Sequence, residues 1–221
     1  MHGDEIKIID SETAISPGDP SSVGALLGLR PGFASPEMGN ILLQLAVSMR
    51  LHGRGGILLV VPADSEEWTH SVLKPIEYAL DPAFSGLSRL LRKGAEEDRS
   101  PRWKDALRSA IDGIAGLTSV DGATVITANY ELCAFGAKII RRRGSTQVGE
   151  VIVYEPIEGG TPTLAEPAQL GGTRHLSAAQ FVHDQHDSIA LVASQDGRFT
   201  VFTRSLEEKM VHARRIDSLL L

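Results

Sequence analysis

After a short lead-in, the chain shows a helical pattern followed by a strongly apolar run. Ser35-Pro36-Glu37 combines a helix-capping serine with a proline at the first helical position, and apolar side chains then recur every three or four residues up to Met49. We expect a helix that ends near His52. Residues 56–61 (GILLVV) are continuously apolar, which is typical of a strand buried on both faces of a sheet.

Two more helices and several short strands follow. Asp81-Pro82 and Ser100-Pro101 each place a capping residue before a proline, so each is expected to open a helix. The next apolar runs are short and favour strands at 123–127, 132–139 and 150–154. Helices that alternate with buried strands predict an α/β fold, a mixed β-sheet flanked by helices on both sides.

The last third of the chain contains a loop, a helix and a hairpin. Residues 155–172 hold three prolines and four glycines and are expected to form a loop. Gly172-Thr173 then opens a helix that runs to Val182. Strands at 188–193 and 198–203 are expected to pair, because the turn dipeptide Asp-Gly separates them.

These patterns divide the chain into three parts. Residues 1–34 are interrupted by prolines and glycines and predict a weakly structured lead-in. Residues 35–205 contain every predicted strand and form one domain. Residues 206–221 are charged with an apolar end and predict a C-terminal helix.

Composition and charge exclude several functions. The 221 residues include 22 Lys+Arg and 28 Asp+Glu, a formal charge of −6, which disfavours long nucleic acid as a partner. The single cysteine, Cys133, has no partner for a disulfide within the chain and fits a reducing compartment. The N-terminus lacks the basic and apolar regions of a secretion signal, and no apolar run approaches the length of a membrane span. We therefore expect a cytoplasmic protein with no membrane partner.

Two of the three motifs that could carry chemistry lie on turns beside strands. Asp121-Gly122-Ala123 places a carboxylate before a predicted strand, with two small residues that let a ligand approach the backbone. Ser194-Gln195-Asp196-Gly197 follows a buried strand, where ligands of α/β sheets gather. Taken alone, each motif favours a plain structural turn.

The third motif is a glycine pair at the start of a helix, Gly171-Gly172-Thr173-Arg174. Unpaired backbone amides and the helix dipole at such a start attract anions. Thr173 adds a hydroxyl, and Arg174 adds a cation that can bind phosphate through two hydrogen bonds. The motif therefore fits a phosphate site, although a plain helix start fits it equally.

Taken in chain order, the three motifs resemble those of the diadenylate cyclase (DAC) domain, which condenses two ATP molecules into cyclic di-AMP. That family pairs Asp-Gly-Ala with a later Gly-Thr-Arg-His-Arg and with a Ser-Glu pair after a buried strand. The matching residues are Asp121-Gly122-Ala123, Ala134-Phe135-Gly136-Ala137, Gly172-Thr173-Arg174-His175 and Ser194. The resemblance is clear over residues 116–205 and extends more weakly back to residue 36, which makes 35–205 a DAC-like nucleotide-binding domain.

The resemblance implies a mechanism and a role for each matching residue. In a face-to-face homodimer or higher homo-oligomer, each 3′-hydroxyl attacks the α-phosphate of the ATP held opposite and pyrophosphate is released. Asp121 would bind Mg²⁺ or Mn²⁺ beside the attacking hydroxyl, and Arg174 and His175 would act on the triphosphate. The remaining nucleotide contacts would come from Gly122, Ala123, Gly172, Thr173, Leu176, Ser177, Ser194 and Gln195.

Two positions depart from the family pattern, since the chain reads GGTRHLSAA and SQDG. Leu176 replaces a second arginine, and Gln195 replaces a glutamate. The changes remove one cation and one possible metal ligand. The alternative is therefore a DAC-like nucleotide-binding or sensor module with weakened catalysis. A third hypothesis makes the C-terminal helix a docking segment for another protein.

Overall fold

The computed structural model describes residues 36–96, 100–155 and 160–216, and the predicted lead-in at 1–34 lies outside them. In chain order, its elements are α2 (Pro36–Leu51), β1 (Gly56–Val61), the 3-10 helix η2 (Glu67–Ser71), β2 (Tyr78–Phe84), α3 (Gly86–Glu96), α4 (Pro101–Leu117), β3 (Ala123–Thr127), β4 (Leu132–Ala137), β5 (Val151–Tyr154), β6 (Thr163–Ala165), α5 (Pro167–Gly171), α6 (Thr173–Asp184), β7 (Ile189–Ala193), β8 (Phe199–Arg204) and β9 (Val211–Arg215).

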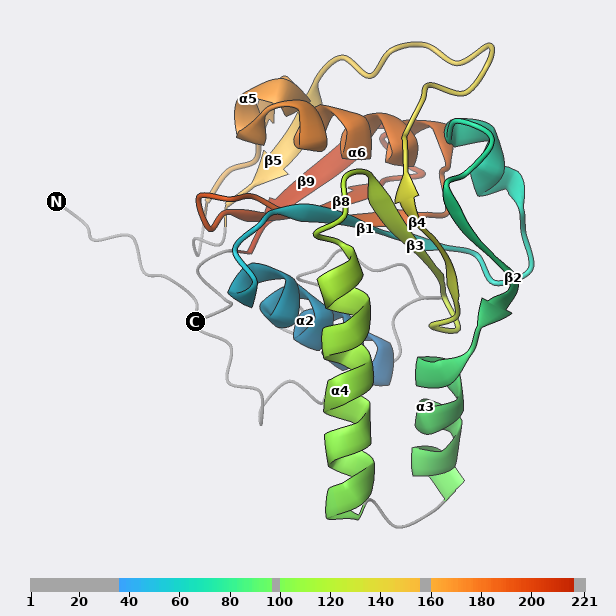
Figure 1. Ribbon diagram of the computed structural model, residues 1–221. Helices are drawn as coiled ribbons and strands as arrows, with labels where there is room; N and C mark the ends of the chain where they lie inside the picture. The colour runs from blue at the N-terminus through green and yellow to red at the C-terminus, as the bar shows by residue number, and fades with distance from the viewer. Residues whose placement is uncertain (1–35, 97–99, 156–159, 217–221) are drawn as a thin grey trace, which may run out of the picture.

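One mixed sheet of nine strands, in the order β2-β4-β3-β1-β7-β8-β9-β5-β6, forms the middle layer. β1 is parallel to β3 and antiparallel to β7, and β9 is parallel to β5. The helices α2, α3 and α4 lie on one side of the sheet, and α5 and α6 lie on the other (Figure 1). The predicted α/β class, with a mixed sheet between helices, is therefore confirmed.

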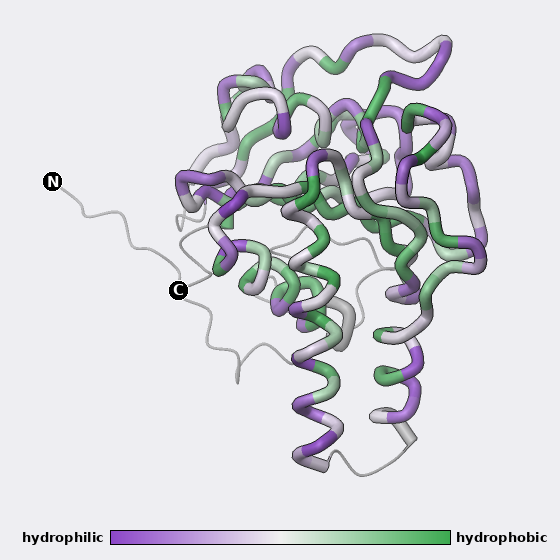
Figure 2. The backbone as a smooth tube through the Cα atoms, viewed as in Figure 1, coloured by the Kyte–Doolittle hydropathy of each residue, from purple (hydrophilic) through white to green (hydrophobic). Residues whose placement is uncertain are grey.

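Strand β1 is buried on both faces, as its continuous apolar run predicts. Leu58 and Val60 belong to the core beneath α2 and α4, whereas Leu59 and Val61 belong to the core beneath α6. Each buried leucine side chain contributes about 2 kcal/mol of transfer free energy. Figure 2 shows the hydrophobic positions gathered in the sheet and the hydrophilic ones along the outer end of α4. No described helix is both long enough and apolar enough to cross a bilayer.

The predicted C-terminal helix at 206–221 is wrong. Residues 211–215 form the strand β9, which pairs with β8 and β5, and residues 217–221 lie outside the described part of the chain. Val211 and Ala213 are buried against the core beneath α6. The spacing of these two apolar residues is the two-residue period of a strand, but the charged residues around them obscure the pattern.

Two other local predictions need correction. Asp81-Pro82 lies inside β2, and α3 begins later, at Gly86. β2 is an edge strand, where proline is tolerated because one side of the strand makes no ladder hydrogen bonds. The predicted loop at 155–172 contains the short strand β6 and the short helix α5. The start of α4 is as predicted, since Ser100 Oγ accepts a hydrogen bond of 3.3 Å from the Trp103 backbone amide.

Candidate functional site

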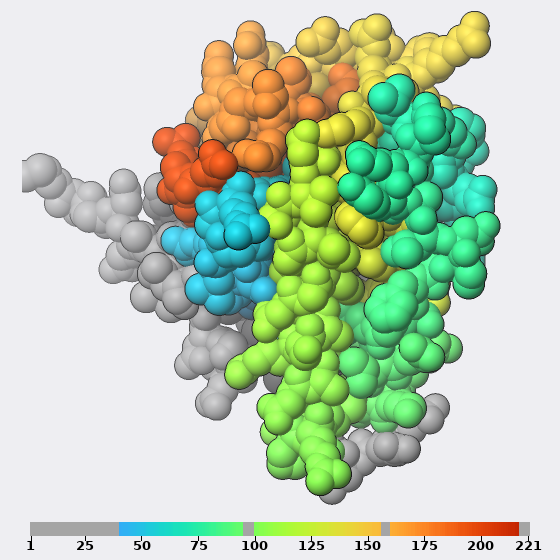
Figure 3. Space-filling view, in the orientation of Figure 1, coloured from blue at the N-terminus to red at the C-terminus, as the bar shows by residue number. Residues whose placement is uncertain are grey.

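The three sequence motifs meet at one end of the sheet. Because β1 is parallel to β3 and antiparallel to β7, the starts of β1 and β3 lie beside the end of β7. Ile57 pairs with Ala123 on one side and with Val192 on the other. In Figure 3 the surface of α5 and α6 (orange) adjoins that of α2 (blue) and of α4 (lime). The topology thus brings together residues that are far apart in the sequence.

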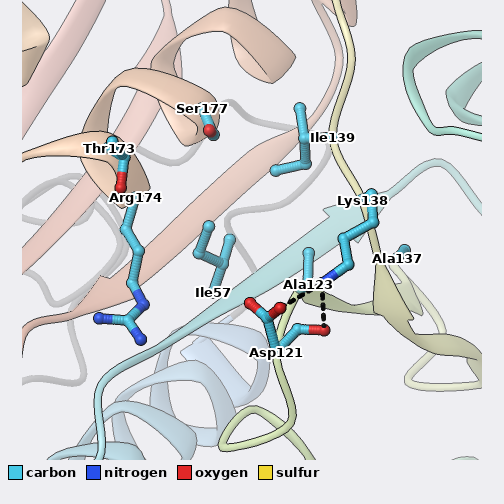
Figure 4. A pocket seen from close by; sticks show the side chains of 10 residues that line it. Ile57, Asp121, Ala123, Ala137, Lys138, Ile139, Thr173, Arg174 and Ser177 are labelled. Atoms are coloured by element: carbon cyan, nitrogen blue, oxygen red, sulfur yellow. Dashed lines mark hydrogen bonds and ion pairs between the residues drawn. The ribbon is translucent and has the colours of Figure 1, made fainter.

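A cavity of about 190 Å³ opens at this end of the sheet. Its lining residues are Ile57, Asp121, Gly122, Ala123, Ala137, Lys138, Ile139, Thr173, Arg174 and Ser177. In Figure 4, Thr173 and Arg174 extend from α6 on one side, Asp121 and Lys138 lie on the other, and Ile57 lies between them. One acidic and two basic side chains therefore border a common space with an apolar floor.

Asp121 presents its carboxylate to solvent at the mouth of this cavity. The side chain is 94% exposed, and its Oδ2 accepts a hydrogen bond from Lys138 Nζ. The hydrogen bond and charge of Lys138 hold the pKa of Asp121 below its usual value, and the more distant charge of Arg174 lowers it further. The carboxylate is therefore ionised at neutral pH and accessible to a ligand.

The sequence motifs did not identify Lys138, although the hairpin of β3 and β4 contained the signal. Ala137, the last residue of β4, pairs with Ala123, the first residue of β3. The residue after β4 must then lie beside the residues that precede β3, which include Asp121. A correct strand register would have placed this lysine in the site.

Arg174 and Gln195 both lie against Gly55, the residue that precedes β1. A methyl group on Gly55 would lie 3.1 Å from a guanidinium nitrogen of Arg174 and 3.3 Å from Gln195 Cγ. Gly55 also has a φ of +71°, which favours glycine. The glycine-pair motif and the Ser194-Gln195 motif therefore lie side by side, with Gly55 between them. Gly172 is the N-cap of α6, with a φ of +77°.

Ser194 makes its hydrogen bonds within the turn between β7 and β8. Its backbone amide donates to Arg198 O at 2.9 Å, and its carbonyl accepts from Gly197 N at 3.2 Å. The Ser194 hydroxyl bonds to Asp196 and lowers the pKa of that carboxyl group. Ser194 does not line the cavity.

His175 points into the protein, away from the cavity. Its side chain is fully buried, its Nε2 lies 3.1 Å from Thr200 Oγ1, and its ring meets Phe202 edge-on. Burial lowers the pKa of His175, so the ring is neutral near pH 7. The expected contact of His175 with a triphosphate in this cavity is therefore wrong, and its place is structural.

The sequence does contain a signal for the buried position of His175. Ala178, Ala179 and Val182 follow His175 at spacings of three, four and seven residues and form the apolar stripe of α6. All three are fully buried. A residue on that stripe faces the core, whereas Arg174 lies beside it, toward the cavity.

A second cavity, of about 340 Å³, adjoins the first through the shared residues Ile139 and Ser177. Its lining residues are Ile139, Ile140, Arg141, Gln147, Leu176, Ser177 and Gln180. Leu176 therefore faces this neighbouring space and not the charged cavity. The carboxamide of Gln180 accepts from Val148 N at 2.8 Å and donates to Thr146 O at 3.0 Å, which holds the loop that carries Gln147, a lining residue of this cavity.

Asp121 is the residue that fits a divalent cation in the charged cavity. Mg²⁺ commonly uses one or two protein carboxylates and completes its shell with water and substrate phosphates. Asp121 supplies one exposed carboxylate of this kind. Within the described ranges, no group of three or more His, Cys, Asp and Glu is placed to hold a metal ion. A metal here would therefore depend on a phosphate ligand.

No family model matches the sequence, and no curated protein matches it significantly. The residues and geometry of the two cavities are therefore the basis for a functional proposal.

Proposed function

We propose that the protein is a diadenylate cyclase-like nucleotidyltransferase that condenses two ATP molecules into cyclic di-AMP. One observation carries the proposal. Asp121 and Arg174 come from separate motifs of the expected order and lie on opposite sides of one cavity, which Gly122 and Ala123 also line. A carboxylate for a metal and a guanidinium for phosphate are the groups that phosphoryl transfer requires.

The two adjoining cavities fit the two halves of a nucleotide. The first has charged walls and lies at the start of α6, which suits a phosphate chain. The second has apolar walls at Ile139, Ile140 and Leu176, which suit a nucleobase. A ribose would lie between base and phosphates, at the shared boundary formed by Ile139 and Ser177. This arrangement favours a nucleotide over an inorganic phosphate or a long nucleic acid.

The reaction proceeds between two copies of the chain. In each of two steps, a 3′-oxygen forms a bond to the α-phosphorus of the ATP held opposite, and the bond from that phosphorus to the bridging oxygen breaks. Pyrophosphate leaves, and the hydroxyl proton passes to solvent. The 94% exposure of Asp121 supports this arrangement, because a partner's nucleotide can reach it directly.

The chain's own residues position the reactants and neutralise charge. Arg174 and the free amides at the start of α6 bind the phosphate chain and hold it in line with the attacking oxygen. Thr173 and Ser177 add hydroxyl donors from the same helix. His175 fixes the start of α6 to the core without touching the substrate. When bound, Mg²⁺ or Mn²⁺ on Asp121 supplies charge stabilisation for the phosphates.

The proposal is tested by incubating the purified protein with ATP and Mn²⁺ and identifying products by mass spectrometry. Cyclic di-AMP and pyrophosphate are expected. The rate per protein molecule is expected to rise with protein concentration, because the reaction needs two copies. Absence of product at every protein concentration contradicts the proposal.

A second candidate function is a DAC-like module that binds nucleotide without turnover. Two observations favour it. Leu176 contributes no charge and faces the second cavity, and the neutral Gln195 lies beside Arg174 where a carboxylate could otherwise help to hold a metal. This candidate predicts saturable binding of ATP or of the cyclic dinucleotide and no pyrophosphate release.

A further inference from the structure

Lys138 lies where one ammonium group reaches both Asp121 and the charged cavity. Its Nζ donates to the Asp121 carboxylate and also to the Asp121 backbone oxygen, the latter at 3.3 Å. The same side chain lines the cavity opposite Arg174 (Figure 4). Lys138 is thus the second cation of the cavity, on the wall that carries the acid.

The ion pair is poorly placed to serve stability alone. The Lys138 side chain is 45% exposed and that of Asp121 is 94% exposed. Pairs so exposed contribute little to folding, because water screens the attraction and both side chains lose freedom. The pairing does, however, reduce the ability of both groups to bind a ligand. An ammonium has three donors, and Lys138 directs two of them to Asp121.

A nucleotide with its metal would compete for both partners at once. The carboxylate is a ligand for the cation, and the ammonium is a partner for phosphate oxygens. When Asp121 exchanges the ammonium for a metal ion, the long and half-exposed lysine side chain can turn toward the phosphates. The cavity then presents cations on both walls, Lys138 on one and Arg174 on the other.

We infer that Lys138 is a phosphate-binding residue that pairs with Asp121 until a nucleotide–metal complex binds, and that then contacts the phosphate chain opposite Arg174. The inference rests on the proposed function, since it takes a nucleoside triphosphate as the ligand. It assigns Lys138 two opposite effects. Lysine opposes binding of the metal alone, because it competes for Asp121, and it favours binding of the metal–nucleotide complex.

These opposite effects are measurable with Lys138→Met, which keeps most of the length of the side chain and removes its charge. Binding of Mn²⁺ alone is followed by the electron paramagnetic resonance signal of the free ion. Binding of the Mn²⁺ complex of α,β-methylene ATP, which cannot release pyrophosphate, is followed by calorimetry. Lys138→Met should tighten Mn²⁺ alone by about two- to fivefold. It should weaken the nucleotide complex by about tenfold or more.

Two controls separate this role from a structural one. Lys104→Met makes the same change at an exposed position on α4, away from the cavity, and should alter neither affinity. Asp121→Asn added to Lys138→Met should abolish the gain in Mn²⁺ affinity. If Lys138→Met weakens both ligands, or leaves either affinity unchanged, the inference is wrong while the proposed function stands. If the wild-type protein binds no nucleotide, the proposed function itself fails.

Discussion

Gly122 and Gly136 lie in direct contact across the β3–β4 hairpin. A methyl group on Gly122 would lie 2.5 Å from the carbonyl carbon of Gly136, and Gly122 has a φ of +115°. Both features require glycine. The contact holds the turn that carries Asp121 against the end of β4, and so places the carboxylate beside Lys138.

Replacement of Gly122 by alanine should therefore destabilise the fold and misplace Asp121. A side chain at this φ with a backbone clash is expected to cost about 2 kcal/mol or more in the free energy of unfolding. Gly149→Ala is the matched control, because a methyl group on Gly149 would meet no atom within 4 Å and the residue has no left-handed φ. Urea unfolding should separate the two variants, and equal midpoints would contradict the contact.

Arg174→Gln should weaken nucleotide binding without loss of the fold. A hydrogen bond from a charged donor contributes about 1.5–3 kcal/mol, so the dissociation constant of the Mn²⁺ complex of α,β-methylene ATP should rise about tenfold or more. Arg108→Gln, at an exposed position on α4, is the control and should bind as wild type does. An unchanged affinity in Arg174→Gln would remove Arg174 from the phosphate site.

The sequence identified the elements with strong patterns and missed those that depend on strand pairing. The run at 56–61 was predicted correctly because a strand buried on both faces is apolar throughout, and the helix start at Thr173 because a glycine pair precedes it. The strand at 211–215 was missed, because its two buried apolar residues, Val211 and Ala213, lie among polar and charged residues. Local patterns do not reveal which distant strands will pair with a short segment.

The sequence placed two residues of the site correctly, misplaced one and missed another. Asp121 and Arg174 lie on one cavity, as the motif order suggested. His175 was assigned to the wrong side of its helix, because the motif gives chain position but not the face that packs on the sheet. Lys138 belongs to no motif, and its place follows from the register of β4 against β3.

The buried His175 predicts a loss of stability in acid. Because burial lowers its pKa in the folded protein, the unfolded chain binds the proton more readily. The contribution of the neutral His175 to the free energy of unfolding is therefore complete above the unfolded pKa of about 6.5. It is lost as the pH falls toward and through the folded pKa. His52 and His212 also have lowered pKa values, so they add to the loss of stability in acid. The share of His175 is therefore found by comparing the fall in the urea midpoint of the wild-type protein with that of His175→Gln.

His175→Gln keeps a polar side chain that does not titrate. Its urea midpoint should fall less than the wild-type midpoint between pH 7.5 and pH 5. Equal declines in the two proteins would mean that His175 is not the group whose protonation destabilises the fold.

Restoring the two departures from the DAC pattern separates a cyclase from a binding module. Leu176→Arg adds a cation in the second cavity, and Gln195→Glu adds a carboxylate beside Arg174. If the wild-type protein binds ATP but releases no pyrophosphate, a gain of cyclic product in the double variant favours the binding module. High activity of the wild-type protein excludes that alternative.

The most direct test compares cyclic di-AMP formation by the wild-type protein, Asp121→Asn and Asp64→Asn in ATP and Mn²⁺, with products identified by mass spectrometry. Asp64 is an exposed acid beyond the opposite end of β1, so its variant controls for the loss of one surface charge. Wild type and Asp64→Asn should form the product at similar rates, and Asp121→Asn should lose about a hundredfold or more. Equal product from Asp121→Asn and wild type, or none from wild type, would contradict the proposed function.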